Sequence, residues 1–259
     1  MRWLFGIVFL SPSLLWGQNS PWVQQGTISL TPPLLTVDSA FFYQQATYQA
    51  KHPMAEAAVH CQWVSSDSVS EIPAEGKLSA DAELQCTASH PDFLTSAPAT
   101  LSVRKLPPHT AWSLLATSTP PNEKYAAEGL ATLRDHRSPT LDYQKHWLGY
   151  YQPKVELQLQ LDAAKECERV SLSSMVDHRT WIFEPTRIEL WDGETLLSHL
   201  DITPATEQQK PHLRMYDLLF DLREVTSLSV RIHTTTHLPA WHPGNGYQGW
   251  FFVDEILID

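Results

Sequence analysis

The sequence predicts an all-β protein built from antiparallel β-sandwiches. Short runs in which apolar and polar residues alternate recur along most of the chain, and turn residues separate them. Patterns typical of helices are nearly absent. A hydrophobic content of 42% with ten tryptophans can fill sizeable cores, and 259 residues suffice for one large β domain or two modest ones.

The first group of predicted strands lies in the N-terminal part of the chain. The runs cover residues 27–32, 40–50, 57–64, 82–89 and 99–105. They are followed by "KLPPHTAWSLLATSTPPNE", whose paired prolines cannot donate hydrogen bonds to a β-ladder. We therefore place a domain boundary near Leu106, with a first domain over residues 18–105 and a second over residues 106–259.

The second group of predicted strands fills the C-terminal part of the chain. The runs cover residues 154–161, 168–176, 186–193, 212–222, 227–236 and 250–258. In the last run, apolar residues alternate up to Ile258, one residue before the end of the sequence. We therefore expect this strand to be a central part of the fold.

The chain begins with "MRWLFGIVFLSPSLLWGQNS", in which one arginine precedes an apolar stretch that ends at the small residue Gly17. The stretch is too short to span a membrane but has the pattern of a cleaved secretory signal peptide over residues 1–17. A buried N-terminal strand is the alternative. No other transmembrane segment is predicted, so we expect a secreted, periplasmic or cell-surface protein.

Export would place the three cysteines in a compartment where disulfides persist. Cys61 and Cys86 both lie in alternating runs, and a bridge between them would stabilise the fold by about 3 kcal/mol. Two buried free thiols are an equally good interpretation, because the number of cysteines is odd. Cys167 is expected to be a small core residue.

Charge and motifs exclude two classes of function. The net charge of −11 and the lack of clustered Lys and Arg argue against nucleic-acid binding. Asp254 and Glu255 are adjacent, and neighbours on a regular strand point to opposite faces, so they cannot act as an acid and base pair on one bond. No nucleophile or metal-hydrolase motif is present. We therefore predict that the protein is not an enzyme.

Aromatic and polar residues gather instead on predicted loops. Trp241, His242 and Tyr247 flank an irregular turn made by residues 243–246, and a flat ring beside polar donors suits a sugar. The tryptophans of the other segments are more readily explained as packing residues. They are Trp147, Trp181 and Trp250.

Two segments carry a resemblance to a known family. "VSLSSMVDHRTWIFEPTRIELW" and "LPAWHPGNGYQGWFFVDEILI" resemble the discoidin-like (coagulation factor 5/8 type C) module that follows the catalytic domain of secreted bacterial β-N-acetylhexosaminidases. The resemblance covers about Trp112 to Asp259. The first part of the chain resembles, more loosely, the Ig-like domain of chitobiase C-termini. The fold implied is an Ig-like β-sandwich followed by a discoidin-like, galactose-binding-like β-sandwich (jelly roll), without the catalytic barrel.

The resemblance also implies a function. We expect a secreted, non-catalytic carbohydrate-binding protein that recognises an amino sugar or galactoside through Trp241, His242, Tyr247, His178 and Arg179. The alternatives are a structural or adhesion module that binds a protein partner, or an accessory part of a hexosaminidase-type glycoside hydrolase system.

A structural calcium ion is implied as well. The positions that match the family's calcium ligands are Asp135, Thr140 and Glu255, with backbone carbonyls, and these hard oxygen ligands suit Ca²⁺. The alternative is that the two carboxylates are ordinary surface groups or a capping pair.

Overall fold

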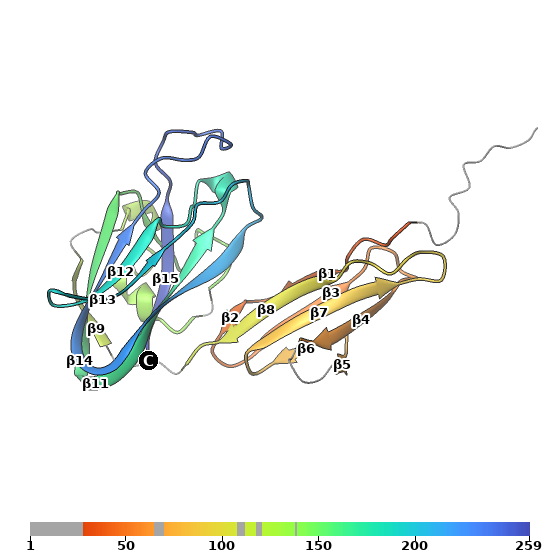
Figure 1. Cartoon of the computed structure of the whole chain (residues 1–259), viewed down its shortest axis with the longest axis horizontal. Helices are drawn as coiled ribbons and strands as arrows, with labels where there is room; N and C mark the ends of the chain where they lie inside the picture. The colour runs from red at the N-terminus through yellow and green to blue at the C-terminus, as the bar shows by residue number, and fades with distance from the viewer. Residues whose placement is uncertain (1–27, 65–69, 108–111, 118–120, 138) are drawn as a thin grey trace, which may run out of the picture.

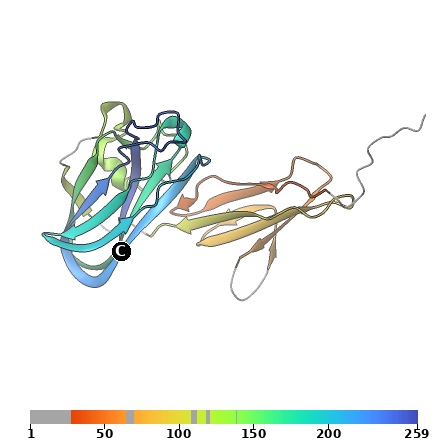
Figure 2. The ribbon, with the colours of Figure 1, turned by 45° about the horizontal axis from the view of Figure 1, so that its top comes forward.

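The structure is a computed structural model that describes residues 28–64, 70–107, 112–117, 121–137 and 139–259. It confirms the predicted all-β class, because strands make up nearly all of the regular structure (Figures 1 and 2). Among the residues described, no helix is long and apolar enough to cross a membrane. The predicted signal peptide, residues 1–17, lies outside this part of the chain.

The described residues before Leu106, the part that we predicted as a first domain and so name here, form two sheets that enclose a small core. One sheet has the order β1 (Leu34–Val37), β3 (Ala46–Lys51), β6 (Glu75–Leu78). The other has the order β2 (Phe41–Phe42), β8 (Ala99–Lys105), β7 (Ala82–Ser89), β4 (Ala58–Trp63), β5 (Glu71–Ile72). Alternate residues of these strands point inward, as the sequence pattern predicts. The larger of two clusters of buried side chains described here consists of Phe42, Ala46, Tyr48, Leu78, Leu84 and Val103.

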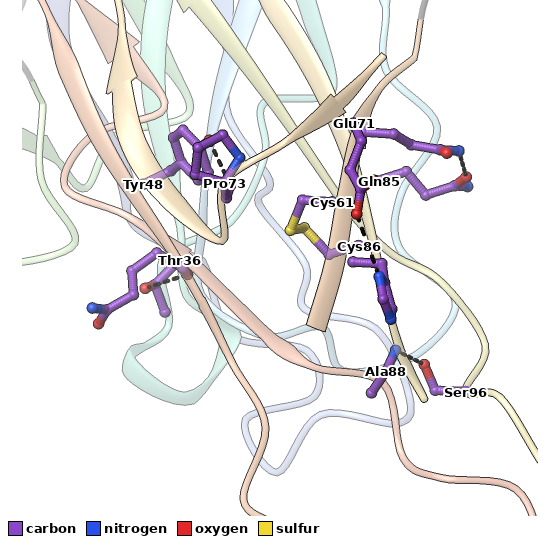
Figure 3. Close-up of a disulfide and its surroundings, with 12 residues drawn as sticks. Thr36, Tyr48, Cys61, Glu71, Pro73, Gln85, Cys86, Ala88 and Ser96 are labelled. Carbon is purple, nitrogen blue, oxygen red and sulfur yellow. Dashed lines mark hydrogen bonds and ion pairs between the residues drawn. A yellow bond between two sulfur atoms is a disulfide. The ribbon is translucent and has the colours of Figure 1, made fainter. Parts of the chain in front are cut away.

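A disulfide joins neighbouring strands of the larger sheet (Figure 3). Cys61 of β4 lies directly opposite Cys86 of β7, with a distance of 4.1 Å between the Cα atoms. Both cysteines are buried, and they pack with Ala50 of the smaller sheet. The structure therefore decides between the two interpretations of this pair in favour of the bridge. Cys167 is a buried free cysteine in the core of the second domain, as expected.

Between Leu106 and Asp259, the part that we predicted as a second domain and so name here, the described residues form seven strands and three short 3₁₀ helices. The strands are β9 (Trp112–Thr117), β10 (Leu148–Tyr150), β11 (Lys154–Val176), β12 (Arg187–Asp192), β13 (Thr195–Asp201), β14 (His212–His233) and β15 (Phe251–Ile258). The helices are η1 (Glu123–Tyr125), η2 (Gly129–Arg134) and η3 (His178–Thr180).

Two very long strands, β11 and β14, build both layers of this domain. Their register shifts between Gln160 and Lys165 and again between Cys167 and Arg169, and there the paired strands bend together (Figure 1). On one side of the bend they join β9, β12 and β13; on the other side they join β10 and β15. The core between the layers therefore receives side chains from both halves of the same strand, such as Leu157 and Leu172.

The sequence predicted two strands where each of these long strands lies. Residues 162–166 of β11 are exposed and mostly polar, a pattern that also fits a turn. The pairing with β14 stops after Gln160 and resumes at Lys165, opposite Val225, because a bulged ladder tolerates exposed, unpaired residues. A further difference is β9, which forms inside the Pro-rich segment that we interpreted as a boundary.

Contacts between described residues join the two domains. The Arg104 Nη1 atom lies 2.8 Å from both carboxylate oxygens of Asp217, and the Ser39 hydroxyl donates to the carbonyl oxygen of Pro139 at 2.9 Å. The rings of Tyr43 and His136 lie 5.6 Å apart. The first domain therefore contacts the second beside η2 and β14.

Candidate functional site

Four connections meet at the end of the second domain that includes the long loop before β15, drawn in dark blue at the top of Figure 1. They are residues 151–153, 177–186, 202–211 and 234–250. Hydrogen bonds join them: Trp241 Nε1 to the Ala205 oxygen (3.0 Å), Thr235 Oγ1 to the Glu184 oxygen (2.7 Å), and Thr234 Oγ1 to the Gln152 oxygen (2.6 Å). Because each loop is fixed by its neighbours, side chains on their outer surface are held in defined positions.

His178 lies in the interior of this loop end. Its Nδ1 atom accepts a hydrogen bond from the Gln209 amide at 3.1 Å, so the proton of the neutral ring is on Nε2, which donates to Glu184 Oε2 at 3.2 Å. The ring stacks on Phe183 with 4.5 Å between centroids and is completely buried. The sequence placed His178 among the ligand contacts, but in the structure both nitrogens are already used inside the protein.

His242 is also buried and has both ring nitrogens bonded. Its Nδ1 atom accepts from the Gly244 amide at 3.0 Å, and Nε2 donates to the His178 carbonyl oxygen at 2.8 Å. It was another expected ligand residue. Its position shows that it fixes the turn to the loop of residues 177–186.

Trp241 is half-buried. Its ring lies 5.1 Å from His178 and 6.0 Å from Phe183, and its indole nitrogen is bonded to Ala205. Most of the indole therefore packs against the loops, and only part of its surface faces solvent.

Tyr247 and Arg179 are the expected ligand residues that face solvent. Tyr247 is 66% exposed, and its ring centroid lies 6.1 Å from that of Trp181 at an angle of 50°. The Arg179 side chain is 61% exposed, with its Nε atom 3.3 Å from Asp177 Oδ1. The outer surface of the loop end therefore presents an aromatic pair and a guanidinium group.

Trp181 was expected to pack in the interior, but it is only half-buried. It has a left-handed backbone conformation (φ 67°), which ends η3 and turns the chain back. Gly244 makes room for its indole, because a Cβ atom at that position would lie 2.6 Å from Trp181 Cη2. The sequence contains one signal for this contact, the glycine in the turn. It does not indicate that Trp181 is the side chain that packs against this glycine. Trp147, by contrast, is buried as expected.

A buried group of carboxylates lies elsewhere in the domain. On β15, Asp254 and Glu255 lie together opposite Ser173 of β11, because the register shifts between Leu172 and Ser174. Both are completely buried. We expected the two side chains to point to opposite faces, as they do in a regular strand. The bulge interrupts the regular alternation of side chains at this point.

The Asp254 carboxyl is in an unfavourable environment for a charge. Burial, and then the neighbouring Glu255 and Asp135 carboxylates, raise its pKa to about 9. Neither of its oxygens forms a hydrogen bond with another described residue. Tyr43 of the first domain lies beside this group, and burial together with the Glu255 charge raises the pKa of its hydroxyl.

The predicted calcium ligands are partly brought together by this arrangement. The Asp135 and Glu255 carboxylates lie close enough to influence the same group, Asp254, and the three are hard oxygen donors. Thr140 is exposed, and its carbonyl oxygen accepts a hydrogen bond from the Trp147 indole at 3.1 Å. Within the described part of the chain, no three His, Cys, Asp or Glu side chains form a group that could hold a metal ion. A calcium site would therefore need Thr140 and backbone carbonyls as further ligands.

No protein-family model matches the sequence, and no curated protein sequence matches it. Solved structures are similar at low identity. The family 32 carbohydrate-binding module of EndoD from Streptococcus pneumoniae has 12% identity and a TM-score of 0.36, covering 57% of this chain and 94% of the module. The C-terminal domain of a chitobiase from Bacteroides fragilis has 11% identity and a TM-score of 0.35, covering 58% of this chain and 93% of that domain.

A third structure, a SusE-like protein, extends over more of the chain. It covers 86% of this chain and 95% of its own, with 10% identity and a TM-score of 0.35. Values this low do not allow a function to be transferred from any of the three proteins. The function must be argued from the residues of this chain.

Proposed function

We propose that the protein binds carbohydrate, without catalysis, at the loop end of its second domain. The observation that carries the proposal is the pair formed by the exposed Tyr247 and the half-buried Trp181, on loops that the buried His178 and His242 connect by hydrogen bonds. A sugar ring stacks its C–H groups on such a face, and an ordered platform loses little entropy when it binds.

Polar groups near the aromatic pair suit the hydroxyl groups of a sugar. Arg179 is exposed on η3, and Asn245 is exposed two residues before Tyr247. The sequence resemblance to discoidin-like modules of hexosaminidases supports a neutral amino sugar or a galactoside as the ligand. We place the protein outside the cytoplasm, since its buried disulfide suits an oxidising compartment.

Replacing Tyr247 with alanine should weaken sugar binding about tenfold or more, because an aromatic contact residue is removed from the centre of the platform. Isothermal titration and Trp fluorescence with galactose, N-acetylgalactosamine and N-acetylglucosamine measure the affinity. Leu222→Ala is the matched control, because Leu222 is 60% exposed on the bent part of β14, away from the loops. Both variants should melt within about 2 °C of the wild type, as expected for exposed side chains.

Gly244→Ala tests the same platform by moving a ring instead of removing one. Its added Cβ must displace the Trp181 indole, so we expect a loss of affinity with Tyr247 intact. Gly193→Ala controls for strain alone: nothing lies within 4 Å of its Cβ position, but its positive φ of 56° makes the change destabilising without touching Trp181, so it should lower the melting temperature and leave sugar affinity unchanged. If no sugar binds the wild type, or if Tyr247→Ala binds normally, the proposal fails. A protein partner for the same surface, as in an adhesion module or an accessory subunit of a hydrolase system, then becomes the better explanation.

We further propose that Asp135, Thr140 and Glu255 hold a structural Ca²⁺ ion with nearby carbonyl oxygens. The ion would supply positive charge to buried carboxylates that otherwise repel one another. The support for this is the Asp254 carboxyl, which is buried next to Glu255 without a hydrogen bond from another described residue.

Saturating Ca²⁺ should raise the stability of the second domain, by about 2.7 kcal/mol at one hundred times the dissociation constant. Thermal melts in Ca²⁺, Mg²⁺ and EGTA measure the effect. Glu255→Gln and Asp135→Asn should abolish it, whereas Asp142→Asn, at an exposed carboxylate paired with Lys145, should not. Equal melting temperatures in Ca²⁺ and EGTA would contradict the site.

A further inference from the structure

A second aromatic cluster lies at the same end of the domain and is not used by the proposed site. The ring of Tyr151 lies 4.9 Å from that of Trp250 at an angle of 42°, and the ring of Tyr125 meets that of Trp250 edge-on at 5.0 Å. Tyr151 is 41% exposed, and Trp250 and Tyr125 are half-buried. The cluster therefore presents an open aromatic surface, with Phe252 as its buried base.

This cluster is continuous with the Tyr247 platform through the backbone. The Trp250 amide donates to the Trp181 carbonyl oxygen at 2.8 Å, and the Phe183 amide donates to the Trp250 oxygen at 2.9 Å. Residues 181–183 and 250 thus form one rigid connection with an aromatic group on each side.

Two side-chain amides border the second cluster. Gln152 follows Tyr151, and Gln248 precedes Trp250 by two residues; the Gln152 Oε1 and Gln248 Nε2 atoms form no hydrogen bond with another described residue. Both atoms are buried, and a buried amide atom that lacks a partner costs free energy, so these two atoms favour an ordered water that provides one. Amide groups next to an aromatic face suit sugar hydroxyls as both donors and acceptors.

We propose that Tyr151 and Trp250 form a second subsite, which binds a further sugar ring of an oligosaccharide whose first ring lies on Tyr247 and Trp181. This inference rests on the proposed function and adds to it that the ligand is an oligosaccharide rather than a single terminal sugar. The alternative is that the cluster only packs the fold. Packing explains why Phe252 and the inner face of Trp250 are buried. It does not explain an exposed tyrosine ring next to two amides without partners.

The test compares ligand lengths by isothermal titration on the full chain. The probes are N-acetylglucosamine with chitotetraose, and galactose with β-1,4-galactotetraose. For the pair that binds, the tetrasaccharide should bind the wild type about tenfold more tightly than the monosaccharide. Tyr151→Ala should remove this preference and leave monosaccharide affinity unchanged, whereas Tyr151→Phe should retain most of it. Thermal melts of both variants verify that they are folded.

The outcomes separate this inference from the proposed function. If mono- and tetrasaccharide bind equally, or if Tyr151→Ala keeps the preference, the second subsite is wrong while sugar binding at Tyr247 stands. If Tyr247→Ala and Tyr151→Ala reduce monosaccharide affinity equally, the two clusters form a single site and the inference fails. If no probe binds the wild type, both proposals are overturned.

Discussion

Replacing His178 with leucine should lower the free energy of unfolding of the second domain by about 3 kcal/mol, because it leaves the buried Glu184 carboxylate and the Gln209 amide without a hydrogen-bond partner. His178 is completely buried between the Gln209 amide and the Glu184 carboxylate. Leucine can accept no hydrogen bond from Gln209 and donate none to Glu184. Arg214, whose Nη1 atom lies 3.9 Å from Glu184 Oε1, can offset only part of this loss. Urea unfolding followed by Trp fluorescence measures the change.

A double-mutant cycle distinguishes this support role from direct ligand contact. Glu184→Gln removes the buried charge, so the loss caused by His178→Leu should be smaller in that background. A His178→Leu variant with normal stability and no sugar affinity would instead show that His178 contacts the ligand.

The two histidines show where prediction from the sequence ends. Alternation of apolar and polar residues located the longer strands, because each needs only a pattern of period two. It missed β1, β6 and β13, and the predicted run at residues 27–32 contributes only an isolated bridge at Ser29. His178 and His242 lie in loops, and no periodic pattern tells whether a loop side chain points inward. Their burial depends on hydrogen bonds with Gln209, Glu184 and Gly244. Gln209 is distant in the sequence, and no motif marks Glu184 or Gly244 as a partner of a histidine.

Long-range pairing also decides features that the local pattern leaves open. The exposed segment around residues 162–166 fits a turn, yet β11 continues because β14 bends with it. Asp254 and Glu255 would lie on opposite faces of a regular strand, yet both are buried where they share a single partner, Ser173. Such bulges depend on the register between two strands, which a single sequence does not specify.

The aromatic residues of the last strand were expected to be central, and this expectation can be tested residue by residue. Phe252 is 1% exposed and packs with Trp147, Met175 and Ile182. Phe252→Ala should therefore lower the free energy of unfolding by about 3–5 kcal/mol, through lost burial and the cavity that remains. The same urea unfolding measurement applies.

Trp250→Ala provides the contrast. Trp250 is only half-buried, so folding buries less of its apolar surface than it would for a fully buried indole. We expect a smaller loss of stability than for Phe252→Ala, together with loss of the preference for longer sugars. If Trp250→Ala is instead the more destabilising of the two, its indole is a core residue. The second subsite would then be wrong, because an indole that is fully packed in the core has no exposed surface for a sugar to contact.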